Sequence, residues 1–275
     1  MSHAAPASVA RDAAIPLAGG ASLAARIYGR KPAGAAAPLA LHFHGGTFTQ
    51  GDLDSGACMA GLLVNAGAVV VSVAYPLAPA HPFPEPVEAG YAALEWTFKY
   101  RSKLAGANAA VYLAGEEAGG NLAASVAFVA RDRGHPPLAG QILVAPMLDP
   151  CVGTASLRER MACATECKFA DGWQQYLRSE RDAEHPYAVP AHAMRLAGLA
   201  PALVLTSADD PLRDEALAYA RRLREAGIEV TAEVLAPDTG WPDSLAQPPT
   251  NECPCAAGVE RHLRAFFQRA TPPPA

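Results

Sequence analysis

The sequence predicts an α/β fold, in which a mostly parallel sheet is covered by helices on both faces. Short apolar runs of strand length alternate with amphipathic stretches of helical length, the pattern of strand–helix–strand units. Of the 275 residues, 51% are hydrophobic, which is enough apolar surface for a doubly covered sheet. A chain of this length is typical of one large domain, so we expect a single domain over residues 1–275.

The predicted strands are five to eight residues long and rich in valine, leucine and isoleucine. They cover residues 39–44, 68–75, 109–114, 141–145, 202–206 and 228–235. The predicted helices have one apolar face and cover residues 56–66, 86–100, 117–131, 211–227 and 259–269. Residues 150–196 interrupt this alternation. We expect them to form a cap insertion over the carboxyl ends of the strands, where open α/β sheets bind ligands.

Charge and composition exclude several classes of partner. The net charge is −5 and 18% of residues are charged, so neither nucleic acid nor an anionic membrane surface is an expected partner. No run of about 18 apolar residues indicates a membrane span. The first 20 residues lack the basic start and apolar centre of a secretory signal, which favours a cytoplasmic protein.

The six cysteines do not form paired C-x-x-C motifs, and we expect reduced thiols, no metal site and no cofactor. The alternative is a soft metal held with a nearby histidine by Cys163 and Cys167, or by Cys253 and Cys255.

Three motifs carry a resemblance to a known family. Residues 44–48 read HGGTF, residues 72–96 read SVAYPLAPAHPFPEPVEAGYAALEW, and residues 210–215 read DPLRDE. In this order and spacing they resemble the hormone-sensitive-lipase-like esterases of the α/β hydrolases. The resemblance implies a small acyl- or ester-like ligand, an oxyanion hole at Gly45, Gly46, Thr47 and Ala118, and an acidic triad residue at Asp210. By analogy with the family it also allows a homodimer.

The chain departs from that family at the nucleophile. Residues 114–122 read AGEEAGGNL, where the family has GDSAGGNL on a sharp strand-to-helix turn that projects a serine. The glycines that permit the turn are present. Glu117, however, stands at the serine position and Glu116 at the preceding aspartate. The hydroxyl that would attack an ester is therefore missing.

The histidine base is missing as well. In the family it lies on the loop after the last strand, and residues 235–255 here contain no histidine. Serine-hydrolase catalysis needs a hydroxyl, an imidazole and a carboxylate, of which only Asp210 remains. Asp210 has a structural alternative, as the cap of a helix that starts at Pro211. We therefore predict a member of the family without serine-hydrolase activity, a pseudoenzyme that keeps a ligand-binding pocket.

Three hypotheses follow for Glu117. Its carboxylate could accept the hydrogen bonds meant for a substrate oxyanion, each contributing about 1.5–3 kcal/mol, and leave the pocket inert towards esters. It could act as an acid, base or nucleophile in non-hydrolytic chemistry such as elimination or isomerisation, if the cap desolvates it. Hydrolysis could also proceed through groups that the motifs do not reveal. Further pocket candidates are His44, Glu116 and Trp241.

Overall fold

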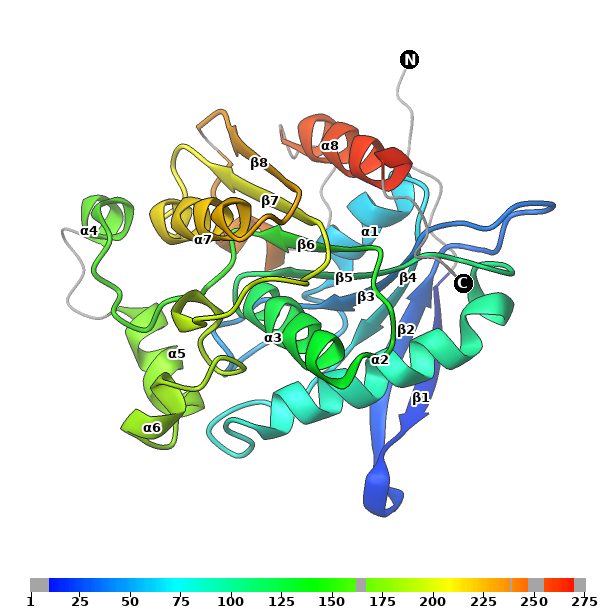
Figure 1. Cartoon of the computed structure of the whole chain (residues 1–275), viewed down its shortest axis with the longest axis horizontal. Coiled ribbons are helices and arrows are strands. Elements are labelled where there is room, and N and C mark those ends of the chain that lie inside the picture. The colour runs from blue at the N-terminus through cyan, green and yellow to red at the C-terminus, as the bar shows by residue number, and fades with distance from the viewer. Residues whose placement is uncertain (1–9, 162–166, 238, 247–254, 270–275) are drawn as a thin grey trace.

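The computed structural model describes residues 10–161, 167–237, 239–246 and 255–269. It contains an eight-stranded sheet in the order β1-β2-β4-β3-β5-β6-β7-β8 (Figure 1). All neighbours from β4 to β8 are parallel. The strands are β1 Ala10–Pro16, β2 Ser22–Tyr28, β3 Leu39–Phe43, β4 Val69–Val73, β5 Val111–Glu116, β6 Gly140–Val144, β7 Ala202–Ser207 and β8 Val230–Leu235. The predicted α/β class and the six predicted strands are confirmed.

The first two strands were not predicted. β1 and β2 form an antiparallel hairpin, and β2 pairs antiparallel with β4. Most of β1 is exposed, so its sequence lacks an apolar run that would mark it as a strand. In β2, Leu23, Ala25 and Ile27 are buried and alternate with more exposed residues, the period of a half-buried strand. This alternation of buried and exposed positions was the sequence signal from which β2 could have been predicted.

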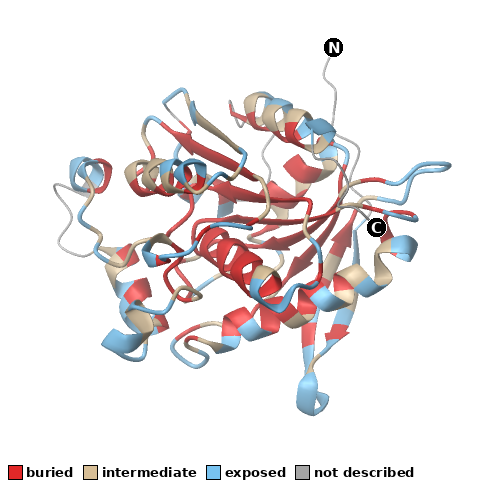
Figure 2. Ribbon diagram, viewed as in Figure 1, coloured by how far each residue is buried: buried red, intermediate tan, exposed pale blue. Residues whose placement is uncertain are grey.

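Helices cover both faces of the sheet. α2 Glu85–Leu104, α3 Ala118–Arg133 and α7 Arg213–Glu225 contribute their buried residues to one apolar cluster. α1 Ala57–Asn65 and α8 Ala256–Arg269 contribute theirs to a second cluster on the opposite face. Figure 2 shows the central strands and α3 buried almost throughout, because α3 packs on β3, β5 and β6 and against α2, which lies beside it on the same face and contacts β3 and β4. No helix in the described ranges is long and apolar enough to cross a membrane.

The insertion after β6 contains three short helices, α4 Ala155–Met161, α5 Lys168–Tyr176 and α6 Glu180–Ala183, followed by a 3-10 turn at Pro190–His192. α5 lies against the loop that follows β3. A Cβ atom on Gly172 would overlap the Thr47 carbonyl, so the absence of a side chain there permits the close approach. The insertion thus contacts the edge of the sheet where the parallel strands end.

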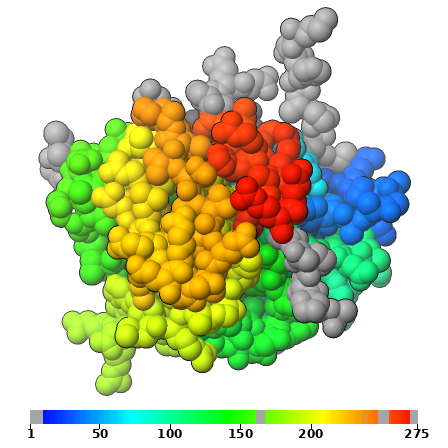
Figure 3. Space-filling model, turned by 45° about the horizontal axis from the view of Figure 1, so that its top comes forward, coloured from blue at the N-terminus to red at the C-terminus, as the bar shows by residue number. Residues whose placement is uncertain are grey.

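The segment after β8 places Trp241, a predicted pocket residue, in the core. Trp241 is 2% exposed and Leu245 is fully buried, and both pack in the cluster that α1 and α8 cover. Trp241 is thus a core residue rather than a gate of the pocket, because its large apolar ring gains more from burial beneath α1 than from a place on a loop. In the space-filling view, α8 (red) lies beside the orange β8 region on one face of the molecule (Figure 3).

The cysteines also differ in part from the expected reduced state. Cys58, Cys151 and Cys167 are free thiols, whereas Cys255 is disulfide-bonded. Cys163 and Cys253 lie outside the described residues.

Candidate functional site

The turn between β5 and α3 places Glu117 at the carboxyl edge of the sheet. Glu117 has φ 53° and ψ −118°, a strained backbone conformation that costs a non-glycine residue about 1–3 kcal/mol. The turn is tight because Gly115 and Gly119 lack side chains. A Cβ on Gly115 would overlap the Gly119 carbonyl, and one on Gly119 would overlap the Phe43 carbonyl. The local sequence therefore still builds a sharp elbow, and its apex carries a carboxylate.

The loop after β3 lies directly beside this elbow. Phe43 pairs with Gly115 in the parallel register, so residues 44–48 run alongside residues 116 and 117. The Gly46 N–H donates to Glu117 Oε2 at 2.6 Å. Thr47 and Phe48 both have positive φ, 50° and 67°, a conformation uncommon for side-chain-bearing residues. The loop is thus bent so that its amides face the elbow, and one of them already holds the Glu117 carboxylate.

Lys168, at the start of α5, contacts the same carboxylate from the insertion. Its Nζ lies 3.8 Å from Glu117 Oε1 and also pairs with Asp243 on the segment after β8. Burial raises the pKa of Glu117, and the positive charge of Lys168 and the hydrogen bonds from Gly46 and Thr47 oppose this without cancelling it. An acidic side chain and its counter-charge therefore occupy the apex of the elbow.

Aromatic side chains fill the space between the insertion and the loop. The Phe48 ring stacks on Tyr176, with centroids 4.0 Å apart, and lies 5.0 Å from the Trp173 ring. All three are buried. Glu117 lines neither the cavity beside Phe83 and Tyr187 nor the cavity beside Arg131 and Leu199.

Glu116 points away from Glu117 into a buried polar network. Its Oε2 lies 2.7 Å from His42 Nε2, and His42 Nδ1 lies 2.9 Å from Ser72 Oγ. Its Oε1 accepts the Gly45 N–H at 3.1 Å. The Gly45 N–H therefore binds Glu116 and is not available to the oxyanion of a substrate. The network ties β3, β4 and β5 together beneath the loop and holds that loop in place.

His44 has a comparable supporting role. Its Nδ1 lies 2.7 Å from the Gly45 carbonyl, and its ring stacks on Tyr75 with centroids 4.4 Å apart. Burial lowers the pKa of His44, which favours the neutral ring with Nδ1–H donating to that carbonyl. Its Nε2 is buried without a hydrogen-bond partner.

Asp210 is fully buried and its hydrogen bonds are internal. Oδ2 accepts from Thr206 Oγ1 at 2.6 Å, and Oδ1 accepts from the Leu212 N–H at 2.8 Å. Burial raises the pKa of Asp210 to about 6. The predicted helix start at Pro211 is wrong, since α7 begins at Arg213. The hydrogen bond from the Leu212 N–H to Asp210 Oδ1 lies in the turn just before the helix.

No histidine in the described part of the chain forms a hydrogen bond with Asp210 or Glu117. The neighbouring Asp209 makes the contacts to the loop after β8: its Oδ1 accepts from Ser207 and Thr239, and its Oδ2 from the Gly240 N–H at 3.3 Å. Asp238, a further polar residue of that loop, lies outside the described residues.

One cluster has the side chains that a metal ion could use. Ligand atoms of Asp149, Cys151 and His192 lie within 4.8 Å of one another where the insertion leaves and rejoins the sheet. His192 Nε2 lies 3.5 Å from Asp149 Oδ1, and His192 and Cys151 are exposed. The direct contact between His192 and Asp149 already accounts for their proximity.

Comparison with known proteins decides the family. A family model described as alpha/beta hydrolase fold matches residues 40–238. The chain belongs to the α/β-hydrolase fold family. It is 38% identical over 204 residues to "Esterase LipI" of Mycobacterium tuberculosis, covering 72% of this chain and 63% of that protein. It is 35% identical over 212 residues to "Gibberellin receptor GID1" of Oryza sativa, covering 72% of this chain and 59% of that protein.

The match to a solved structure is more extensive. The thermophilic carboxylesterase EstE1, cloned from a metagenomic library, has 33% sequence identity and a TM-score of 0.84. That alignment covers 97% of this chain and 91% of EstE1. The chain spans less than two thirds of LipI and GID1, so its likeness to those two proteins covers only part of each.

Within this α/β hydrolase, the motifs predicted some of the site residues and missed others. Glu117 and Gly46 are in direct contact, Glu116 and His44 brace the loop, and Asp210 lies apart from them with its own partners. Lys168 was missed, because it lies on an insertion without a recognisable pattern. His42 and Ser72 were missed too, although a polar residue inside an otherwise apolar strand is itself a signal of a buried partner.

Proposed function

We propose that this chain is a non-hydrolytic member of the esterase-rich α/β-hydrolase family, whose catalytic centre has become a fixed internal contact. One observation carries the proposal: Glu117, at the apex of the elbow, accepts the Gly46 amide that would otherwise stabilise a substrate oxyanion. The side chain cannot serve as the serine of a triad, and no imidazole is bonded to it or to Asp210 within the described residues.

Energetics favour the internal carboxylate over an ester. A hydrogen bond to a charged acceptor contributes about 1.5–3 kcal/mol, against about 0.5–1.5 kcal/mol for a neutral carbonyl. Glu117 is also tethered, so it competes at a high local concentration that dilution does not reduce. A protonated Glu117 still presents a carbonyl oxygen to Gly46, so the amide stays occupied in either state.

A binding role fits the relatives as well as a catalytic one. LipI is named an esterase and GID1 a receptor, so chains similar to this one carry both kinds of name. We propose a small acyl- or ester-like molecule as the ligand class.

Turnover of short p-nitrophenyl esters tests the proposal. The natural protein is expected to hydrolyse p-nitrophenyl acetate no faster than buffer, and Glu117→Ser alone is expected to remain inactive because it lacks a base. Glu117→Ser with Gly240→His should gain activity if the loop can present an imidazole to the new serine. Gly240 has φ 67°, where a histidine costs about 1–2 kcal/mol, so Thr239→His serves as a second placement. Robust turnover by the natural protein would overturn the proposal.

A second function is favoured by one observation. Burial raises the pKa of Glu117, which brings a carboxyl group closer to the range of an acid–base catalyst. In this alternative, displacement of Lys168 would free Glu117 to move a proton in a non-hydrolytic step. Any turnover found for the natural protein should then vanish in Glu117→Gln and be partly kept in Glu117→Asp.

A further inference from the structure

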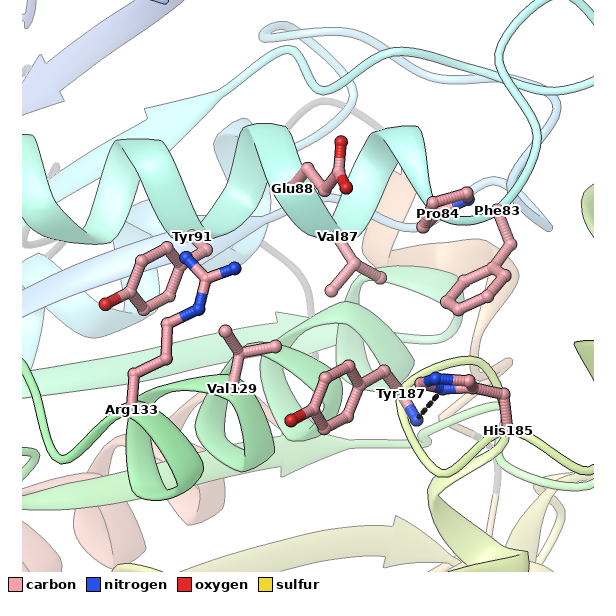
Figure 4. A pocket seen from close by; sticks show the side chains of 9 residues that line it. All are labelled: Phe83, Pro84, Val87, Glu88, Tyr91, Val129, Arg133, His185 and Tyr187. Carbon is pink, nitrogen blue, oxygen red and sulfur yellow. Dashed lines mark hydrogen bonds between the residues drawn. The ribbon is translucent and has the colours of Figure 1, made fainter.

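We propose that a cleft between α2, α3 and residues 185–187 binds a small monocarboxylate with a flat or branched apolar body. The cleft has a volume of ≈ 250 Å³ and is lined by Phe83, Pro84, Val87, Glu88, Tyr91, Val129, Arg133, His185 and Tyr187 (Figure 4). The cleft opens to the surface. Binding there would be a function additional to the one proposed for Glu117.

The cleft is separate from the elbow. Glu117 precedes the first residue of α3, whereas Arg133 is its last residue. At 1.5 Å of rise per residue, the sixteen residues of α3 span about 24 Å. The Arg133 end of the cleft is therefore far from Glu117, and neither Glu117 nor Gly46 lines the cleft. At the other end, the Phe83 ring lies 6.1 Å from Tyr176, which stacks on Phe48.

Apolar surface forms the body of the cleft. Val87 and Val129 form the floor where α2 and α3 pack, and Phe83 closes one end. The two tyrosines present their rings rather than their hydroxyl groups. The Tyr91 hydroxyl donates to the His135 carbonyl at 2.8 Å, and the Tyr187 hydroxyl donates to Asp132 at 2.8 Å. Aromatic walls of this kind favour a flat or branched hydrocarbon group.

Charge identifies the other part of the ligand. The Arg133 guanidinium lies 4.2 Å from the centre of the Tyr91 ring, at the edge of the cleft, and also hydrogen-bonds with the Tyr91 side chain. Among the described residues, Arg133 forms no ion pair within 4.0 Å of an acidic side chain. A guanidinium has five N–H donors, so one hydrogen bond to Tyr91 leaves others available for a carboxylate. Glu88 on the α2 rim carries the opposite charge, so a second carboxylate on the ligand would be repelled.

A polar group also stands at the opposite end. His185 Nδ1 accepts the Tyr187 N–H at 3.1 Å, which leaves the proton of the neutral ring on Nε2. The His185 ring lies 5.2 Å from Phe83 and 5.0 Å from Tyr187. The cleft therefore offers the Arg133 cation at one end, an apolar middle and a ring nitrogen of His185 at the other end, with Glu88 on the rim opposing a second carboxylate; together these select a monocarboxylate of modest length.

Titration of the ¹⁵N-labelled full chain with phenylacetate, followed by NMR, tests this proposal. Phenylacetamide, which has the same shape without the charge, serves as the matched probe. Phenylacetate is expected to shift the amides of Phe83, Val87, Val129 and Tyr187 in a saturable way, with one site per chain. Arg133→Gln should weaken phenylacetate binding about tenfold, the loss expected for one charge-assisted hydrogen bond.

The controls separate a local effect from a general one. Arg221→Gln removes an exposed arginine from α7 and should leave binding unchanged, while Arg133→Lys should restore part of it. Phenylacetamide should bind weakly and equally to the natural protein and to Arg133→Gln. The proposal is overturned if those four amides do not shift, or if Arg133→Gln and Arg221→Gln weaken phenylacetate binding alike. An ester-hydrolysis result would not bear on this outcome.

Discussion

Asp210→Asn should stabilise the protein at neutral and alkaline pH. The Asp210 side chain is fully buried, and burial raises its pKa from 3.8 to about 6. A carboxyl group with a higher pKa in the folded state holds its proton more tightly there than in the unfolded chain. Stability is therefore lost as pH rises from about 4 to 6, and the loss is complete above both values.

The size of the effect follows from the shift. A rise of about two pKa units corresponds to about 3 kcal/mol of lost stability above pH 7. The asparagine removes that loss but disturbs the hydrogen bond from Thr206, which costs about 1 kcal/mol at every pH. The variant should therefore be about 2 kcal/mol more stable than the natural protein at pH 8 and about 1 kcal/mol less stable at pH 3.

Urea unfolding at several pH values measures this difference. Asp209→Asn is the matched control, since burial raises the pKa of Asp209 but its hydrogen bonds from Ser207, Thr239 and Gly240 outweigh burial and lower it to about 2. Relative to the natural protein, that variant should lose stability as pH rises from about 2 to 4, and the difference should stay constant from pH 4 to 6, where Asp210→Asn gains stability. A stability difference for Asp210→Asn that does not change with pH would refute the reasoning.

Three further predictions concern the insertion and the elbow. Gly172→Ala should lower the free energy of unfolding by about 1–3 kcal/mol, because its Cβ would overlap the Thr47 carbonyl. A Cβ on Gly61 in α1 meets nothing within 4 Å, so Gly61→Ala should raise the free energy of unfolding by about 0.5–1 kcal/mol. Equal effects of the two substitutions in urea unfolding would contradict this. Lys168→Met should raise the pKa of Glu117 further, measured by ¹³C NMR of its carboxyl group, and an unchanged pKa would count against the contact. Intact-protein mass spectrometry after treatment with diethyl p-nitrophenyl phosphate should show no adduct, and a modified serine would reveal a nucleophile that the motifs did not.

The sheet and its helices were predictable because their signals are local. Apolar runs of strand length and amphipathic helices were enough to predict six strands and the helices on both faces. The β1–β2 hairpin was not predicted, since β1 is largely exposed at an edge and its register depends on pairing with β2. Trp241 was misassigned because the sequence around it is loop-like, and its burial results from packing against a distant helix.

The site was predictable only as far as motifs reach. The elbow sequence places Glu117 and the HGGTF stretch places Gly46, but no pattern connects either with Lys168, which comes from the insertion. The pKa of Glu117 also depends on this tertiary context. An amide-bound carboxylate alone would have a lowered pKa, and burial under α5 reverses the direction.

Two features that lower stability persist although the catalytic serine and histidine are missing. Glu117 retains a strained backbone, and Asp210 retains a buried carboxyl group without an imidazole partner in the described residues. Strain at such positions persists when the surrounding packing determines it. Here, the close contacts of Gly115 and Gly119 with neighbouring backbone fix the turn whatever side chain stands at its apex.

NMR of the Gly46 amide addresses the contact between Glu117 and the oxyanion loop most directly. With 2.6 Å between donor and acceptor, the Gly46 amide proton of the natural protein should be shifted far downfield and should titrate with Glu117 at a pH above the ordinary glutamate range. Glu117→Gln should abolish that titration. A Gly46 amide that is insensitive both to pH and to Glu117→Gln would show that the carboxyl group does not occupy this position.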